Sequence, residues 1–176
     1  MFLDLDGKRC VVVGGGAVAN RKARKLLQAR ARVAVISPEV RPELRSMALE
    51  VHERPYEEGD LEGASLVFAA TNDREVNAAV AREAQRRGIP VNVADNPSEG
   101  DFALPSTLRR GHLQVAVSTG GASPTLARRV RRELEDAFGP EWAGIVEELG
   151  RARKGGRKAE AEMEEVVEEC LSRLRG

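Results

Sequence analysis

Short apolar runs alternate with longer amphipathic stretches along the first hundred positions of the chain. The apolar runs are rich in β-branched residues and are expected to form buried strands; they cover residues 9–13, 33–36, 66–70 and 91–93. The stretches between them predict helices and one edge strand, with helices over residues 18–29, 42–49 and 74–87 and the edge strand over 51–54. Strands separated by helices predict an α/β fold with a doubly wound parallel sheet over residues 1–100.

The pattern changes after residue 100. Two apolar runs, 102–108 and 113–118, predict a pair of strands joined by a turn at Arg109–His112. Amphipathic helices are expected over residues 124–138, around Trp142, and from about 159 to 174. Because the domain before them is complete, they predict a homodimer. We expect a dimerisation and substrate region over 101–150 and a C-terminal helical segment over 151–176.

A run of glycines follows the first predicted strand and opens the first predicted helix. The spacing Gly14-x-Gly16-x-x-Ala19 is the dinucleotide-binding fingerprint with alanine in its third position. Gly14 permits the tight turn, Gly16 lets backbone approach a pyrophosphate, and Ala19 lets the helix pack close to the strand. The helix N-terminus at Ala17 and Val18 offers N–H groups to the phosphates. The alternative is a glycine turn in the same sheet without a ligand.

Polar residues follow the other predicted strands. In a parallel sheet the carboxyl ends of the strands share one edge, and ligands bind beyond it. Besides the glycine loop, the expected cofactor-binding residues on this edge are Ser37, Pro38, Glu39, Thr71 and Asn72. The acid that contacts the ribose hydroxyls usually comes about 20 residues after the fingerprint, close to Ser37 and Glu39. Glu39 favours NAD as the cofactor, whereas Arg41 nearby leaves NADP open.

Composition removes several classes of partner. The formal net charge is zero and aromatic residues make up 3% of the 176 residues, which argues against nucleic acid, because its binding domains use basic patches and aromatic stacking. The two histidines and two cysteines do not suggest a histidine-built metal site, a zinc site or a disulfide framework. No apolar run approaches membrane-spanning length and the N-terminus lacks a signal-peptide pattern, so we expect a cytoplasmic protein without a membrane partner.

A second glycine-rich loop, residues 118–124, precedes the predicted helix over 124–138. Ser123 is placed as the N-cap of this helix and Pro124 as its first residue. With Arg128 one turn into the helix, the loop is either an anion site or an ordinary loop with a solvated arginine face. Arginine greatly outnumbers lysine in the chain. Arginine suits bidentate recognition of carboxylates, although codon bias or thermal adaptation explains the excess equally well.

Three stretches together resemble a known family. They are Val11–Lys22, Ala69–Asp73 and the long run from Asn92 to Arg128. The sequence is similar to the precorrin-2 dehydrogenase / sirohydrochlorin ferrochelatase family, the NAD-dependent module of siroheme synthases, over most of residues 1–150. The resemblance implies a Rossmann-type domain. We expect the stand-alone form, since the chain has no room for the methyltransferase domain that some siroheme synthases append.

The resemblance also implies an activity. It implies NAD-dependent oxidation of precorrin-2 to sirohydrochlorin by a homodimer and, in some members, insertion of Fe²⁺ to give siroheme. The family's key carboxylate matches Asp95, which follows the last strand of the sheet and could accept a proton as hydride leaves, or handle metal. From the residues alone, Asp95 could instead cap the turn before Asn96 and Pro97. The chain departs from the family at Asn96, where many members carry a second acid, and at His112, where proline is common.

A tetrapyrrole substrate carries many carboxylates, which would give the arginine excess a reason. The candidate substrate-binding residues are Thr119, Gly120, Ser123, Arg128 and His112, and the candidate carboxylate clamps are Arg109, Arg110, Arg128 and Arg132. A non-catalytic NAD-sensing regulatory domain is the alternative, and it would need neither Asp95 nor the loop 118–124. A third interpretation is a dehydrogenase that acts on another small substrate. The sequence does not support it, because it contains neither a Ser/Tyr-x-x-x-Lys pair nor a catalytic His–Asp pairing.

Overall fold

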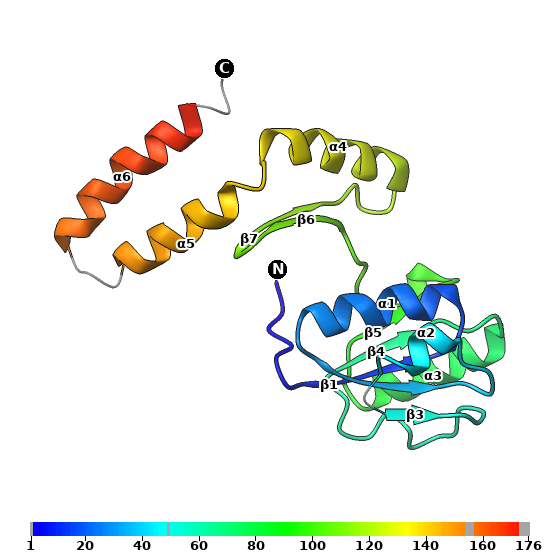
Figure 1. Ribbon diagram of the computed structural model, residues 1–176. Helices are drawn as coiled ribbons and strands as arrows, with labels where there is room; N and C mark the ends of the chain where they lie inside the picture. Colours follow the sequence, from blue (N-terminus) through cyan, green and yellow to red (C-terminus); the bar gives the residue numbers. More distant parts are fainter. Residues whose placement is uncertain (1, 49, 154–156, 173–176) are drawn as a thin grey trace. The chain divides into compact units, whose positions relative to one another are not determined.

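A computed structural model of the chain describes residues 2–48, 50–153 and 157–172 (Figure 1). The chain divides into two compact units, unit 1 (Met1–Ala103) and unit 2 (Leu104–Gly176). The expected end of the last helix at Leu174 lies outside the described residues. The roles that the sequence assigns to residues 1–100, 101–150 and 151–176 stay predictions.

Unit 1 is built on five parallel strands in the order β3-β2-β1-β4-β5. The strands are β1 Arg9–Val13, β2 Arg32–Ile36, β3 Glu50–His52, β4 Leu66–Ala69 and β5 Val91–Val93. The helices are α1 Ala17–Gln28, α2 Pro42–Arg45 and α3 Arg74–Arg86, with a short 3-10 helix, η1, at Pro97–Glu99. Helices α1 and α3 lie on opposite faces of the sheet (Figure 1). The predicted Rossmann-type α/β fold is confirmed.

The strand order reverses between β1 and β4. The chain runs outward from β1 through β2 to β3, then returns to β4 beside β1 and continues to β5. Ligands of such sheets bind beyond the carboxyl ends of the strands at this reversal. Here β1 passes into Gly14, and β4 passes into Ala70 and Thr71.

The apolar core explains why β4 is a continuous apolar run and why β1 is apolar after Arg9. One cluster packs α3 and the adjoining loops against the sheet, and its buried members are Val11, Val13, Ala34, Ile36, Leu61, Val67, Ala69, Val80, Ala81, Ala84, Val91 and Val93. On α1 the buried residues are Ala19, Ala23 and Leu26. Fully burying a valine or leucine side chain contributes about 1.5–3 kcal/mol. The strand ends that carry the candidate residues are therefore held in a well-packed frame.

Two elements of unit 1 differ from their predicted bounds by more than one residue. Helix α2 ends at Arg45 rather than at residue 49, and β3 covers Glu50–His52 rather than 51–54. Strand β3 pairs in parallel with the last three residues of β2. Because this pairing and not local propensity sets where β3 begins, the sequence pattern misplaced it.

A buried carboxylate holds the long segment between β3 and β4. Glu83 of α3 accepts hydrogen bonds from Tyr56 Oη, from the Gly59 N–H at 3.1 Å and from Arg87 Nε at 2.7 Å. Burial alone would raise the pKa of Glu83, but these hydrogen bonds outweigh it and hold the pKa below its ordinary value. The segment is thereby fixed on α3 through a charged, fully bonded group.

The last residues of unit 1 are anchored on the sheet. Asn92 of β5 donates to Phe102 O at 2.8 Å and accepts from Lys22 Nζ of α1 at 2.8 Å. The Lys22 ammonium also lies 5.3 Å from the centroid of the Phe68 ring, which packs edge-on against Phe102. Burial, together with two neighbouring basic side chains, lowers the pKa of Lys22. Phe102 therefore packs on the sheet of unit 1, and the prediction of a strand over 102–108 is wrong at its start.

Unit 2 contains an antiparallel hairpin and three helices in its described part. The hairpin consists of β6 Ser106–Arg110 and β7 Leu113–Val117, and the helices are α4 Pro124–Ala137, α5 Trp142–Ala152 and α6 Arg157–Ser172. Helix α4 packs against both strands of the hairpin. Ser123 Oγ accepts from the Leu126 N–H at 3.2 Å and Pro124 is the first helical residue, as predicted. None of the helices in the described part of the chain is long and apolar enough to cross a bilayer.

The hairpin turn is shorter than predicted. Gly111 and His112 alone join the strands, and Gly111 adopts φ +57°, whereas the sequence predicted a turn over Arg109–His112. Two-residue turns with positive φ match the twist of paired strands. The turn therefore begins two residues later than predicted. Arg109 and Arg110 belong to β6, where they pair with Gln114 and Leu113 of β7.

Arg110 ties the hairpin to the end of α4. Its Nε donates to Phe138 O at 2.8 Å and its Nη2 to Glu135 O at 3.3 Å. Carbonyls of the last helical turn lack intrahelical partners, and a cation there also interacts favourably with the helix dipole. Just beyond, the Phe138 and Trp142 rings pack edge to face with centroids 5.1 Å apart. Arg110, proposed from sequence as a carboxylate clamp, thus has a structural role.

We expect Arg110→Ala to destabilise unit 2 by about 1.5–3 kcal/mol, the usual range for hydrogen bonds that involve a charged group. Trp142 is the single tryptophan of the chain, so urea unfolding followed by its fluorescence reports on unit 2. The matched control is Arg109→Ala on the same strand, whose side chain is exposed and whose loss should change stability by less than about 0.5 kcal/mol. Equal effects of the two substitutions would contradict the capping role.

Candidate functional site

The turn after β1 passes directly against the end of β4. Gly14 adopts φ +126°, and a Cβ on this residue would lie 2.4 Å from Ala70 O. The Gly14 N–H donates to Ile36 O of β2, and the Ala70 N–H donates to Val13 O, both at 2.8 Å. Both the backbone conformation and the close approach require glycine, as the fingerprint predicts.

Gly15 has a role that the sequence analysis did not assign. A Cβ on Gly15 would lie 1.8 Å from Glu39 O, so the loop after β2 packs directly on the glycine backbone. The Arg41 N–H donates to Gly15 O at 3.1 Å, and Ser37 Oγ donates to Glu39 O at 2.8 Å. The run of three consecutive glycines was the available signal. Gly14 and Gly15 together bring the ends of β1, β2 and β4 into contact.

Gly16 faces open space at the start of α1. It is the N-cap residue, and a Cβ built on it would meet no atom of the described protein within 4 Å. Within the described residues no side chain caps this helix N-terminus. In the first turn, Asn20 Oδ1 is buried and has no hydrogen-bond partner in the described structure. Free N–H groups and a missing Cβ fit a dinucleotide whose phosphates lie at this helix end.

The loop after β2 presents the expected ribose-binding residues. The Ser37 hydroxyl is engaged with Glu39 O, whereas Pro38 and the Glu39 side chain are exposed. Arg41 Nε lies 3.5 Å from Glu43 Oε2, so its charge is partly balanced within the loop. A free carboxylate beside a partly balanced arginine favours the ribose hydroxyls of NAD over the 2′-phosphate of NADP.

The turn after β4 leads into α3 through a network of local hydrogen bonds. Asp73 Oδ1 accepts from the N–H groups of Glu75 and Val76 and so caps the helix. Thr71 Oγ1 accepts from the Asp73 N–H at 3.1 Å and contacts Asp73 O at 2.8 Å. Asn72 is exposed at the tip. This turn continues the edge formed by the glycine loop.

Asn77 connects the turn after β4 to Asp95. It is completely buried, and its Oδ1 accepts from the Thr71 N–H at 3.1 Å and from Thr71 Oγ1 at 2.8 Å. Its Nδ2 donates to Thr71 O at 3.2 Å and to Asp95 Oδ1 at 2.9 Å. The sequence analysis missed Asn77, because an asparagine inside a helix carries no pattern that announces its partners. Asparagine is unfavourable in helix interiors, which was the only signal.

Asp95 lies just beyond β5 on the same edge. Its side chain is 35% exposed, and its Oδ2 lies 3.9 Å from Arg74 Nε. Among the hydrogen bonds of the described residues, the one that Asp95 accepts comes from Asn77 and none comes from the backbone of the following turn. The interpretation of Asp95 as a turn cap is therefore wrong, and one carboxylate oxygen is available to a ligand. Among the described residues, no three His, Cys, Asp or Glu side chains are arranged to hold a metal ion.

The structure thus joins the cofactor candidates of unit 1 through direct contacts. The loop 37–39 packs on Gly15, Gly14 packs on the end of β4, and Thr71 is linked through Asn77 to Asp95. This order along the edge follows the strand order β2-β1-β4-β5. Their roles in binding and catalysis stay predictions.

The substrate candidates in unit 2 fall into two places. Thr119 Oγ1 accepts from the Ser123 N–H at 2.9 Å, Gly120 adopts φ +60°, and Arg128 Nη2 donates to Thr125 Oγ1 at 3.1 Å. Thr119, Gly120, Ser123 and Arg128 therefore gather at the start of α4. His112 lies at the other end of β7, about 20 Å away at 3.3 Å per strand residue.

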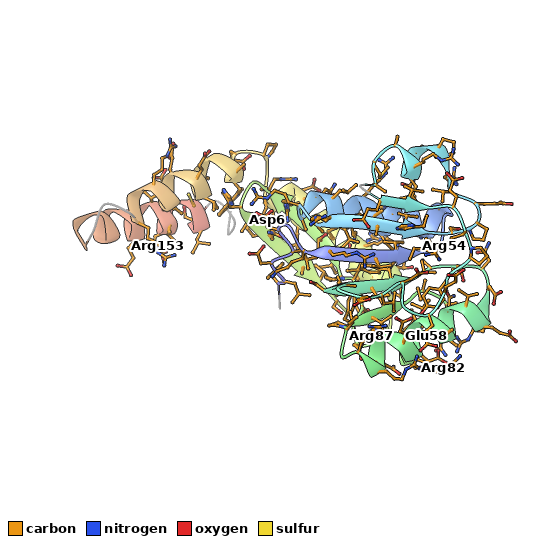
Figure 2. The ribbon with its side chains drawn as sticks, turned by 90° about the horizontal axis from the view of Figure 1, so that it is seen from below. Asp6, Arg54, Glu58, Arg82, Arg87 and Arg153 are labelled. Atoms are coloured by element: carbon orange, nitrogen blue, oxygen red, sulfur yellow. The ribbon has the colours of Figure 1, made fainter. Side chains whose placement is uncertain are left out.

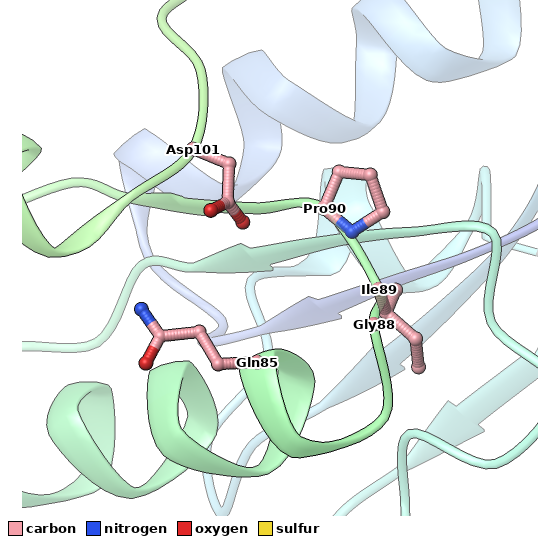
Figure 3. Close-up of a pocket in the computed structure, with 5 residues that line it drawn as sticks. All are labelled: Gln85, Gly88, Ile89, Pro90 and Asp101. Carbon is pink, nitrogen blue, oxygen red and sulfur yellow. The ribbon is translucent and has the colours of Figure 1, made fainter.

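A shallow pocket in unit 1 lies away from this edge. Its lining residues are Gln85, Gly88, Ile89, Pro90 and Asp101 (Figure 3). Pro90 precedes β5, so the pocket is at the amino end of the strand, opposite to Asp95. Its polar groups are engaged, because Asp101 accepts from the Val91 N–H at 2.9 Å and Gln85 donates to Glu99 O at 3.2 Å. Such a pocket offers a ligand few polar partners.

Comparisons with known proteins agree with the geometry of unit 1. Residues 1–106 match the family described as putative NAD(P)-binding, and residues 110–137 match the family described as sirohaem biosynthesis protein central. A solved structure titled SirC, precorrin-2 dehydrogenase, superposes with a TM-score of 0.77 at 27% identity and covers 99% of this chain and 98% of that chain.

Siroheme synthases are similar to this chain over most of its length. The siroheme synthase of Nitrosomonas europaea is 43% identical over 158 residues, which cover 87% of this chain and 33% of that protein. The siroheme synthase of Methylobacillus flagellatus is 48% identical over 139 residues, which cover 77% of this chain and 30% of that protein. The chain thus spans about a third of the length of these relatives.

We expect Gly16→Asp to abolish NAD binding, because it places bulk and negative charge where the phosphates approach the N-terminus of α1. The fold should survive, since the added atoms meet open space. Isothermal calorimetry with NAD measures the loss, and circular dichroism checks the fold. Gly16→Asn is the matched control, which adds similar bulk without charge and should weaken binding less. Unchanged NAD affinity in a folded Gly16→Asp variant would place the cofactor elsewhere.

Proposed function

We propose that this chain, which belongs to the putative NAD(P)-binding family, catalyses the NAD-dependent dehydrogenation of precorrin-2 to sirohydrochlorin in siroheme biosynthesis. The similarity to siroheme synthases and to a precorrin-2 dehydrogenase structure supports this substrate. One observation carries the proposal: a partly exposed carboxylate, Asp95, is held by a hydrogen bond on the edge of the sheet that also carries the dinucleotide loop.

The reaction removes a hydride and a proton from the substrate. NAD, when bound, supplies the hydride acceptor. The protein's residues must then hold the dinucleotide, orient the macrocycle and take the proton. The helix N-terminus at Gly16–Val18 would hold the phosphates and the loop Ser37–Glu39 the ribose. The turn at Thr71 and Asn72 would line the reacting end of the cofactor.

Asp95 is the carboxylate best placed to take the proton. Glu39, the other candidate, follows β2, which is separated from β5 by two strands in the sheet order. At about 4.8 Å per strand spacing, the two positions are about 14 Å apart. Glu39 therefore belongs to the ribose end of the cofactor, whereas Asp95 Oδ2 carries no hydrogen bond in the described structure and can accept a proton from substrate.

The substrate's carboxylates need cationic partners, and unit 2 offers them. Arg109 is exposed on β6, and Arg128 and Arg132 are exposed on α4. Arg110 is engaged at the end of α4 and Arg131 is paired with Glu135. We propose the exposed arginines, together with Thr119, Gly120, Ser123 and His112, as substrate-binding residues, because guanidinium groups bind carboxylates in a bidentate manner.

The relatives favour an enzyme over a non-catalytic NAD-sensing domain. Each relative named above is called a siroheme synthase or a precorrin-2 dehydrogenase. A sensing domain would also have no use for an ordered carboxylate beyond β5. Turnover is the discriminating property, because a sensor binds NAD without reducing it.

We propose that the protein is a homodimer formed largely through residues 113–150. Two apolar side chains one turn apart on the expected amphipathic helix, α4, do not pack on the hairpin, because Leu126 is 53% exposed and Val130 is 37% exposed. The one buried residue of α4 is Ala127. An apolar stripe of this kind, left in water by the described chain, is typical of a protein–protein interface, and a second copy of the chain is the partner that the proposal assigns.

The dimer can be tested by static light scattering at micromolar concentration. We expect a mass of two chains for the unaltered protein. The double variant Leu126→Glu/Val130→Glu should shift the mass to one chain, because charges cannot be buried in an apolar contact without a large penalty. Gln28→Glu on α1, exposed and outside unit 2, is the control and should leave the mass unchanged. A monomeric unaltered protein would overturn the proposal.

We expect Asp95→Ala to dehydrogenate precorrin-2 about 10²–10⁴-fold more slowly, the usual contribution of a general base. NAD reduction followed by absorbance measures the rate, and calorimetry should show unchanged NAD affinity. Asp95→Asn is the matched control: it keeps an oxygen for Asn77 but cannot take a proton, so it should be equally slow. Full dehydrogenase activity with loss of iron insertion alone would assign Asp95 to the metal step.

A further inference from the structure

We propose that Asn77 is the positioning residue of this site: its buried side-chain amide fixes the carboxylate of Asp95 and leaves one oxygen free for the substrate's proton. The proposal rests on the function proposed above. It adds a residue on α3 that contacts neither substrate nor cofactor and acts through Asp95.

The orientation of the Asn77 amide is determined by its partners. The Thr71 N–H is a donor and nothing else, and it lies 3.1 Å from one end of the amide. That end must therefore be the oxygen. The Asp95 carboxylate accepts hydrogen bonds, and it lies 2.9 Å from the other end, which must be the NH₂ group. Flipping the amide would set donor against donor at Thr71 and oxygen against oxygen at Asp95.

The amide hydrogen bond selects which oxygen of Asp95 can react. Asp95 Oδ1 is taken by Asn77, whereas Oδ2 has Arg74 Nε at 3.9 Å, beyond hydrogen-bond distance. Arg74 is also drawn away from Asp95, because its Nη2 pairs with Glu99 of η1. Oδ2 is therefore the oxygen that faces a ligand with its lone pairs unused.

Asp95 has little else to hold it. It lies two residues beyond the end of β5, so the strand ladder does not restrain it. Asn77, by contrast, is completely buried and makes four hydrogen bonds, three of them to Thr71. The amide thus connects α3 and the end of β4 to a side chain that lies outside the strand ladder. Misplacement of a catalytic group by about 1 Å can cost about 10²-fold in rate.

Helix capping does not account for Asn77. Asp73 already satisfies the N–H groups at the start of α3. A buried amide in a helix interior is unfavourable unless every one of its groups is bonded. Here both ends are bonded, and one bond runs to the proposed catalytic carboxylate. Residues that break a local rule and are then fully compensated concentrate at functional sites.

A double-mutant cycle separates positioning from a purely structural role. We compare kcat at saturating NAD for the unaltered protein, Asn77→Ala, Asp95→Ala and the double variant. If Asn77 acts through Asp95, Asn77→Ala should lower kcat about 10²-fold, yet change it less than about twofold when Asp95 is already alanine. Arg82→Ala, exposed on the same helix (Figure 2), is the control and should leave kcat unchanged.

The outcomes are distinct. Equal losses of kcat from Asn77→Ala in both backgrounds would overturn the positioning role while the proposed function stands. An unaltered protein that binds NAD but does not oxidise precorrin-2 would overturn the proposed function and the positioning role with it. If Asn77→Ala does not fold, Asn77→Asp takes its place, because it keeps the oxygen that accepts from the Thr71 N–H and hydroxyl and replaces the NH₂ group that donates to Asp95 and to Thr71 O. It should show the same non-additivity.

A readout independent of turnover tests the contact itself. In ¹⁵N-labelled protein the Asn77 side-chain NH₂ resonance, assigned through its loss in Asn77→Asp, should shift in Asp95→Ala and stay unmoved in Arg82→Ala. The same resonance should exchange slowly with solvent, because it is buried and hydrogen-bonded. A resonance that does not respond to Asp95→Ala would overturn the proposal even in an active enzyme.

Discussion

The close approach of backbone to backbone at Gly14 and Gly15 is the constraint on which the rest of unit 1 depends. Cβ atoms at these two positions would lie 2.4 Å from Ala70 O and 1.8 Å from Glu39 O. Because glycine has no Cβ, the ends of β1, β2 and β4 can meet within one layer. The N-terminus of α1 is then presented at the point where the strand order reverses, which is where sheets of this type bind their ligands.

From this meeting point the candidate site extends in one direction by hydrogen bonds. Thr71 follows β4, Asn77 binds Thr71 from α3, and Asp95 is bound by Asn77. The turn after β4, helix α3 and the turn after β5 are therefore connected to one another, and they rest on the apolar cluster of α3 and the sheet. Such an arrangement suits catalysis. A proton acceptor must keep a fixed position relative to the bound cofactor and substrate, and it must also stay accessible to the substrate.

Unit 2 follows a different logic. Its hairpin and α4 share a small contact, and Arg110 closes it by occupying the carbonyls at the end of the helix. The outer stripe of α4 stays in water in the described chain. A unit with so little buried apolar surface would gain stability from a bound partner, which agrees with the proposed assignment of this region to dimerisation and substrate recognition.

The sequence by itself determined the order of strands and helices in unit 1, the glycine turn and the placement of Asp95 beyond a strand. Each is written in local patterns: apolar runs, the Gly14-x-Gly16-x-x-Ala19 spacing and polar residues that follow strands. Only the tertiary structure decided four other features. They are the close approach of Gly15 to Glu39, the hydrogen bonds of Asn77, the start of β3, and the two-residue hairpin turn that places Arg110 in β6. These features depend on contacts between residues that are well separated in the sequence. Asn77 and Thr71 are 6 positions apart, and Arg110 and Phe138 are 28 positions apart. A local pattern records the residue type at each position but not the partner, because the partner is brought there by the packing of the whole unit.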